Sequence, residues 1–184
     1  MKKLIMAVAI VCAAVATQAA SIAWDANWIV DGTGTDLASG TAYLLTTGGY
    51  AMDSAIADLS AGKFDATKAE MTQDIAWSDD FGASVSKNGA SDLTGSQSFY
   101  MVIVSGKDFM VTDSIATSMK DIGDTYATFG DLSTYNDATG GYDSLYKWQT
   151  VQEQPSTGDV PEPTSGLLLL VGAAALALKR KQAS

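Results

Sequence analysis

The chain has 184 residues, a formal net charge of −10 and no histidine. Five of its eleven basic residues lie at positions 2–3 and 179–181, so residues 21–160 carry twenty acidic side chains against six lysines, a net charge near −14. The absence of histidine excludes histidine-based catalytic triads and His-ligated zinc. Residues 21–160 also contain no arginine, which excludes a bidentate phosphate clamp, and their negative charge disfavours nucleic-acid binding.

The N-terminus has the three parts of a secretory signal. Lys2 and Lys3 precede an apolar run over residues 4–15, and small residues follow up to the candidate cleavage positions Ala19 and Ala20. Twelve apolar residues cover only about 18 Å as a helix, which is too short for a hydrocarbon core of about 30 Å. We therefore expect residues 1–20 to be a signal peptide removed by signal peptidase, which places the protein outside the cytoplasm.

The first strand of the exported domain is predicted over residues 22–30. Period-two alternation puts apolar side chains on one face of a strand. The apolar even positions are Ile22, Trp24, Ala26, Trp28 and Val30. We therefore expect Trp24 and Trp28 to project from the same face of one strand, toward the core.

A second strand and one helix are predicted next along the chain. Residues 41–46 form a β-prone run. In residues 52–61, Met52, Ile56 and Leu59 recur at helical spacing, and Gly62 follows as a helix stop. The pattern predicts a short helix over residues 52–61 that packs against a sheet.

Three later runs, residues 99–104, 108–112 and 145–151, predict further strands. Residues 99–104 have the sequence Phe-Tyr-Met-Val-Ile-Val, which is apolar on both faces. Such a run is typical of a strand that is covered on both sides. In residues 145–151, the alternation places Tyr146 and Trp148 on one face.

These elements predict a mainly β fold, an antiparallel β-sandwich-like single domain over residues 21–148, with the helix covering an edge or an open end. Segments rich in Gly, Ser, Asn and Asp predict connections at residues 31–40, 82–95 and 136–143. Residues 149–159 lose the apolar pattern and are expected to be a linker. The only cysteine lies in the predicted signal peptide, so the mature domain depends on its packed core.

Metal or glycosidase chemistry finds little support in the residue pattern. Residues 31–36, Asp-Gly-Thr-Gly-Thr-Asp, resemble a calcium loop, but Asp36 stands where an EF-hand needs glycine and Ala42 where it needs glutamate. Glycoside hydrolysis needs two carboxyls about 5–9 Å apart, and Asp79 and Asp80 would point to opposite faces of a strand. We expect a non-enzymatic protein without metal or cofactor. A calcium site built from separated loops and a glycosidase remain as alternatives.

Sugar binding is a stronger alternative. Aromatic rings offer the flat apolar surface on which a sugar ring stacks. Trp24 and Trp28 are expected in the core, whereas Trp77, Tyr142, Tyr146 and Trp148 are less constrained. Trp148, with Tyr146 beside it, is the best candidate for sugar stacking. The domain would then be a carbohydrate-binding module.

The C-terminus has three parts in a fixed order. Residues 160–163 contain Pro161, Glu162 and Pro163, residues 166–178 are apolar, and the basic residues Lys179, Arg180 and Lys181 follow. Thirteen apolar residues cover about 20 Å as a helix, so the segment can enter a bilayer but is marginal as a permanent span. The basic triplet stays cytoplasmic and places everything before it outside.

Residues 160–184 closely resemble the PEP-CTERM sorting signal, whose pattern is a Pro-Glu-Pro motif, a short hydrophobic helix and a basic end. The resemblance implies transient membrane insertion and processing by exosortase, with Pro161, Glu162 and Pro163 marking the processing site. It also implies an inner-membrane intermediate and a final place at the cell surface, in the outer membrane or in the extracellular matrix. Because this family often accompanies exopolysaccharide production, the implied function is structural or adhesive, with extracellular polysaccharide as the expected partner.

Overall fold

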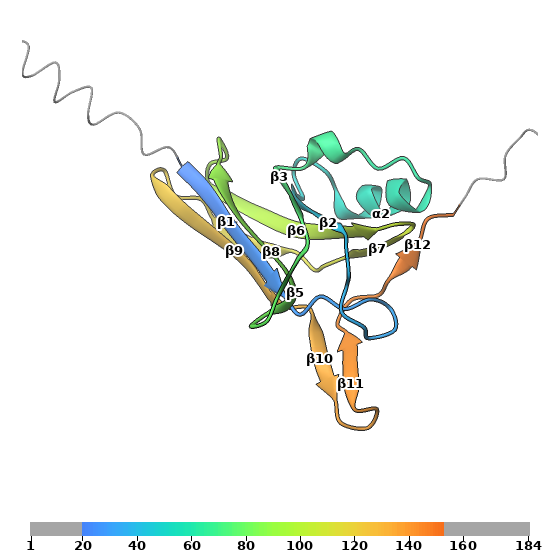
Figure 1. The fold of residues 1–184 in the computed structure, drawn as a ribbon. Coiled ribbons are helices and arrows are strands. Elements are labelled where there is room, and N and C mark those ends of the chain that lie inside the picture. The colour runs from blue at the N-terminus through green and yellow to red at the C-terminus, as the bar shows by residue number, and fades with distance from the viewer. Residues whose placement is uncertain (1–19, 153–184) are drawn as a thin grey trace, which may run out of the picture. The chain divides into compact units, whose positions relative to one another are not determined.

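The structure is a computed structural model that describes residues 20–152 (Figure 1). Within these residues, no helix has the length and apolar character needed to cross a membrane. Most of the expected signal peptide, residues 1–19, and the expected C-terminal helix, residues 166–178, lie outside the described residues.

Two sheets form the body of the domain. The four-stranded sheet has the order β4-β5-β1-β9, with β4 at Ala76–Ser78, β5 at Gly82–Ala90, β1 at Ala20–Asn27 and β9 at Gly123–Asp131. In the second sheet, whose order is β12-β7-β6-β2-β3, β8 also pairs with β6. Its strands are β12 (Gln149–Thr150), β7 (Asp108–Val111), β6 (Ser96–Ser105), β2 (Thr41–Thr46), β3 (Met71–Asp74) and β8 (Ile115–Ser118). Pairing is antiparallel except between β1 and β9, which run parallel.

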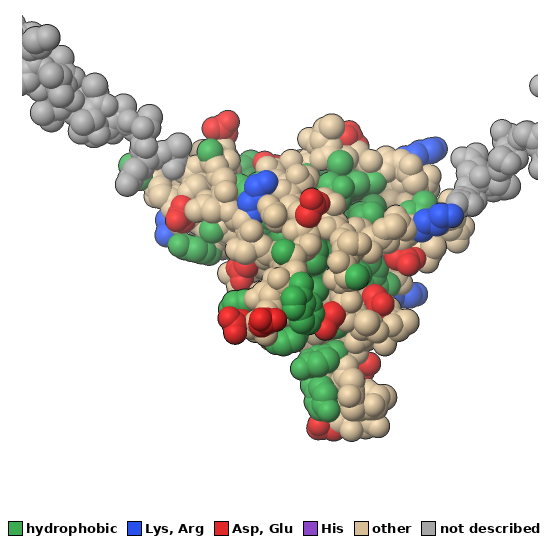
Figure 2. All heavy atoms as spheres, in the orientation of Figure 1, with side chains coloured by type: hydrophobic (Ala, Val, Ile, Leu, Met, Phe, Trp, Pro, Cys, Tyr) green, Lys and Arg blue, Asp and Glu red, His purple; other side chains and the backbone are tan. Residues whose placement is uncertain are grey.

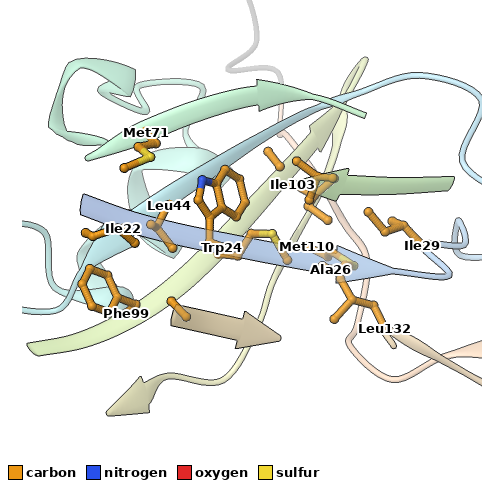
Figure 3. Packing of buried hydrophobic residues seen from close by; sticks show 14 of the residues in the cluster. Ile22, Trp24, Ala26, Ile29, Leu44, Met71, Phe99, Ile103, Met110 and Leu132 are labelled. Atoms are coloured by element: carbon orange, nitrogen blue, oxygen red, sulfur yellow. The ribbon is translucent and has the colours of Figure 1, made fainter. Parts of the chain in front are cut away.

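The main core lies between the two sheets, as a sandwich requires. Ile22, Trp24 and Ala26 on β1 are buried, which confirms the alternation predicted for the start of this strand. They belong to one cluster with residues of the second sheet, among them Leu44 and Ile103 (Figure 3). The mainly β fold and its short helix are therefore confirmed, with the parallel β1–β9 pair as a departure from a purely antiparallel arrangement.

A second, smaller core lies on the outer face of the β2–β6–β7 region. Here α2, Met52–Ser60, buries Ala55 and Leu59 against Tyr100 and Val102 of β6 (Figure 1). The 3₁₀ helix η1, Ala66–Lys68, follows it. Strand β6 is thus covered on both faces, as its uninterrupted apolar run predicts. The helix covers a sheet face and not an edge or an open end, because its apolar side needs the apolar outer face of β6.

The backbone at Trp28 departs from the strand predicted for residues 22–30. Strand β1 ends at Asn27, and Trp28 has a positive φ of 49°. This left-handed conformation interrupts the alternation, so Trp28 does not share a strand face with Trp24. The expectation that both tryptophans project together into the core is wrong for Trp28, which is half-buried at the surface.

Two predicted connections contain strands. Residues 82–90 form β5, because Ala83 and Val85 enter the core while the polar residues between and after them face outward. Residues 133–136 and 141–144 form a two-stranded hairpin, β10 (Ser133–Asn136) and β11 (Gly141–Ser144). Composition alone did not predict β5 or the β10–β11 hairpin, because the outward-facing residues of these strands are typical of turns.

The predicted strand at residues 145–151 is reduced to β12. Its two residues pair with β7, and Val151 and Gln152 donate backbone hydrogen bonds to Lys107 and Ser60. Residues 149–152, which were expected to belong to the linker, are therefore part of the folded domain. The folded unit of the chain ends at Gln152.

Candidate functional site

The loop of residues 31–36 is held by one carboxylate. Asp31 Oδ1 accepts hydrogen bonds from Thr33 N at 2.7 Å, Thr33 Oγ1 at 2.6 Å and Thr35 N at 3.1 Å. Partial burial works to raise the pKa of Asp31, but these hydrogen bonds outweigh it and hold the pKa below its usual value. The loop that resembles a calcium loop is thus organised by its own backbone and threonines. Among residues 20–152, no cluster of three or more acidic side chains is placed to hold a metal ion.

A groove of about 600 Å³ opens beside this loop. Its volume lies within the range of small-ligand sites. It is lined by Asp31, Gly32, Thr33, Thr35, Asp36, Leu37, Ala38, Ser39, Ser105, Asp108, Trp148 and Thr150. The lining therefore joins one indole ring with several hydroxyls and three carboxylates, which are groups that can contact a sugar.

Trp148, a predicted stacking residue, lines this groove and is firmly held. Its Nε1 donates a hydrogen bond of 2.9 Å to the Val30 carbonyl, and part of its ring packs against the main core. Gly32 lies beside it, so that a Cβ at Gly32 would come 3.6 Å from the Trp148 Cβ. Trp148 is therefore half-buried and offers only part of its ring to the groove.

Tyr146, the other predicted stacking residue, does not line the groove. Its ring packs against the main core, and burial, helped by the charge of Asp113, raises the pKa of its hydroxyl. The structure therefore does not bring Tyr146 and Trp148 together as a stacking pair, because the strand that would have aligned them is only two residues long.

A group of aromatic rings lies next to the same loop. The rings of Trp28 and Tyr142 are nearly parallel, with centroids 5.9 Å apart, and Tyr135 meets Tyr142 edge to face at 5.3 Å. We call Trp28, Tyr142 and Tyr135 the aromatic strip. Figure 2 shows hydrophobic side chains running from the body of the domain onto the β10–β11 hairpin. The backbone at Trp28 is held by Phe81, whose carbonyl accepts a 3.0 Å hydrogen bond from Trp28 N.

Two glycines let the backbone fit closely around the aromatic strip. A Cβ on Gly82 would lie 2.7 Å from Trp28 Cε3, and one on Gly34 would lie 2.0 Å from the Tyr142 carbonyl oxygen. Both glycines have positive φ, which residues with a Cβ adopt at a cost. Through Gly32 and Gly34, the 31–36 loop thus contacts Trp148 of the groove and Tyr142 of the strip.

The residue pattern did not predict the aromatic strip. The strand alternation placed Trp28 in the core, and Tyr142, although among the less constrained aromatic residues, lay in a predicted connection and was not linked to Trp28 or Tyr135. The sequence does contain one signal for the hairpin. Tyr135 and Tyr142 flank the turn sequence Asn-Asp-Ala-Thr-Gly-Gly, which favours a hairpin. Trp28 lies more than one hundred residues earlier, so its contact with Tyr142 depends on the tertiary fold.

The predicted sorting and processing residues lie almost entirely outside the described part of the chain. This holds for Pro161, Glu162 and Pro163, for the basic residues 179–181, and for Ala19. Ala20 is the first residue of β1, and its carbonyl accepts a 2.9 Å hydrogen bond from Ser91 N.

Comparison with known proteins finds one match. Residues 159–181 match the PEP-CTERM protein-sorting motif, which confirms the resemblance seen in the C-terminal tail. Neither the curated proteins nor the solved structures contain a match to this chain.

Proposed function

We propose that this chain, whose residues 159–181 are a PEP-CTERM protein-sorting motif, is a non-enzymatic structural or adhesive protein of the cell surface or the exopolysaccharide matrix. The motif indicates an exported protein that exosortase sorts through the membrane. The final location and the role there belong to the proposal. The sorting motif is the observation that carries it.

The chemistry of the exported domain supports a role without catalysis. Residues 20–152 contain no histidine or arginine, and their acidic side chains outnumber the six lysines threefold. Such a charge favours a soluble, hydrated protein that repels anionic polymers. The carboxylate at the centre of the 31–36 loop is engaged in its own turn.

The spacing between the domain and the motif supports processing of a folded protein. The compact unit ends at Gln152, and the motif begins at residue 159. The six residues between these positions can span at most about 20 Å when extended. A membrane protease could therefore reach the motif while the domain stays folded outside the membrane.

Mass spectrometry of the protein recovered from its host tests the sorting step. We expect the mature chain to lack residues 1–19 and 166–184, and we expect residues 166–184 to remain in a host without exosortase. Retention of residues 166–184 in both hosts would show a permanent tail anchor instead. Fractionation of cells and matrix, followed by comparison of matrix cohesion in a deletion strain, tests the structural or adhesive role.

A second candidate function is carbohydrate binding in the groove beside Trp148. This function is favoured because the groove combines the indole ring of Trp148 with the hydroxyl groups of Ser105 and Thr150. Polysaccharide pull-down with Trp148→Ala tests it, provided that circular dichroism shows a folded protein. Thr150→Ala is the second variant, because Thr150 is exposed and its loss leaves the core intact.

A further inference from the structure

We propose that the aromatic strip, Trp28, Tyr142 and Tyr135, is a binding surface for a polysaccharide chain that carries no negative charge. This proposal rests on the proposed function as a surface or matrix protein and names the ligand class. It is independent of the groove beside Trp148, whose ring does not belong to the strip.

The first support is the exposure of rings that are already gathered. Tyr135 is 55% exposed and Tyr142 is 39% exposed, and the ring of Trp28, which stacks on Tyr142, is half-buried. Single exposed apolar residues are ordinary, whereas exposed rings in contact with one another mark a surface for a partner. The rings meet at centroid distances of 5.9 and 5.3 Å, so Tyr142 contacts both Trp28 and Tyr135 and the three rings form one group.

The second support is that the rings are held in place without a ligand. Tyr135 and Tyr142 are directly opposite each other in the β10–β11 register, and Asn136 Nδ2 donates a 2.7 Å hydrogen bond to Asp143 Oδ2. Trp28 is seated against Gly82. A surface that is ordered before binding avoids much of the entropy cost of ordering side chains.

The third support is the kind of side chain in and around the strip. Its members are all aromatic, and aromatic faces suit the apolar C–H face of a sugar ring. The adjacent chain is acidic, with Asp79 and Asp80 before Phe81 and with Asp143 after Tyr142. Figure 2 shows acidic side chains beside the hydrophobic group. Carboxylates accept hydrogen bonds from sugar hydroxyls and repel anionic polymers, so charge selects a neutral or cationic chain.

The test uses the mature protein recovered from its host, with hydroxyethyl cellulose as the neutral probe, chitosan as the cationic probe and alginate as the anionic probe. Affinity electrophoresis measures retention by each polymer. We expect retention by the neutral or the cationic probe and none by alginate. Tyr142→Ala and Tyr135→Ala should each weaken binding about 2- to 10-fold, and Tyr142→Phe should bind as the unsubstituted protein does.

The matched control is Tyr126→Ala. Tyr126 is also exposed, at 61%, but it pairs with Ala23 of β1, five residues before Trp28 and thus about 16 Å along the strand. We expect this variant to bind normally. Equal loss in the control, equal retention by alginate, or no retention by any probe would overturn the proposal. Capture of a protein by the strip with no polysaccharide binding would overturn it too.

Failure of this proposal can be told from failure of the proposed function. Cell fractionation of the Tyr142→Ala strain reports whether the protein still reaches the surface or matrix. A protein that reaches the matrix and supports its cohesion, but binds neither a neutral nor a cationic polysaccharide, would overturn the proposal for the strip alone. A protein that never reaches the surface would overturn the proposed function.

Discussion

Trp24 and Trp28, four residues apart, lie in different surroundings. Trp24 is 1% exposed in the main core, where its Nε1 has no hydrogen-bond partner. An unpaired buried N–H costs about 1–3 kcal/mol, which burial of the large ring offsets. Trp28 follows the end of β1, and its positive φ turns its ring to Gly82 and Tyr142. One backbone conformation thus separates a core residue from a surface residue.

Substitution of Gly82 tests how closely Trp28 is seated. Gly82→Ala adds a Cβ that would lie 2.7 Å from the indole, at a φ of +61°. Gly95→Ala is the matched control, since Gly95 has a φ of +68° but open space around it. We expect Gly95→Ala to cost about 1–2 kcal/mol from backbone strain alone, and Gly82→Ala to cost more and to displace Trp28. Urea unfolding followed by tryptophan fluorescence measures both, and equal costs would contradict the contact.

Helix α2 is attached to β6 by apolar packing and by a short polar chain. The Tyr100 hydroxyl donates a 2.7 Å hydrogen bond to the Tyr50 carbonyl, and the Tyr50 hydroxyl donates to Asp58 in the helix. Leu59 and Ala55 supply the apolar contact. The helix therefore depends on the sheet, as expected for nine residues that are too short to be stable alone.

Truncation of Leu59 tests the apolar part of this attachment. Leu59 is buried, so Leu59→Ala should lower the free energy of unfolding by about 2–5 kcal/mol. Ser54→Ala on the exposed side of the same helix should change it by less than about 0.5 kcal/mol. Urea denaturation provides both values. Similar values for the two variants would show that α2 does not pack as described.

Tyr50 and Tyr100 make the stability of the domain depend on pH in the alkaline range. Burial, then the hydrogen bond to Asp58, raises the pKa of Tyr50 from 10.0 to about 12, and burial raises that of Tyr100 to about 12. A raised folded-state pKa contributes stability below pH 10, and this contribution is lost as the pH rises toward 12. Absorbance titration at alkaline pH should show that Tyr50 and Tyr100 ionise late, as the protein unfolds, with the pKa of Tyr146 shifted in the same direction. Tyr50→Phe should have one late tyrosine fewer than the unsubstituted protein, and early ionisation of all seven tyrosines would contradict the burial.

The whole molecule consists of a folded unit that ends at Gln152 and a following unit that contains the sorting motif. Trp148, β12, Val151 and Gln152 close the folded unit, because they bond to Val30, β7, Lys107 and Ser60. The two sheets and the loop at residues 31–36 thus depend on the last residues before the sorting tail.

Two truncations test this boundary. A chain that ends at Glu153 should have the same urea midpoint as the exosortase-processed protein, since it keeps every described hydrogen bond. A chain that ends at Lys147 loses Trp148 and β12, and it should be destabilised by about 3–5 kcal/mol or fail to fold. Equal stability of the two chains would place the domain boundary before Trp148.

Residue patterns correctly predicted the elements whose burial follows a simple period. Strand β2 has its predicted bounds, residues 99–104 lie in a strand covered on both faces, and residues 52–60 form the helix that stops at Gly62. They did not predict β3, β4, β8 and β9, and they predicted connections where β5 and most of the β10–β11 hairpin lie. Such strands are stabilised by their partners, and their own polar residues are typical of turns.

The sequence by itself determined the sorting tail, the exclusion of histidine chemistry and the β-rich character of the domain. These follow from local patterns or from composition, which do not depend on distant contacts. Only the tertiary structure decided that Trp28 leaves the core and meets Tyr142 and Tyr135 beside the 31–36 loop. The physical reason is that this contact requires a left-handed residue at position 28, a glycine at position 82 and a hairpin more than one hundred residues later to come together.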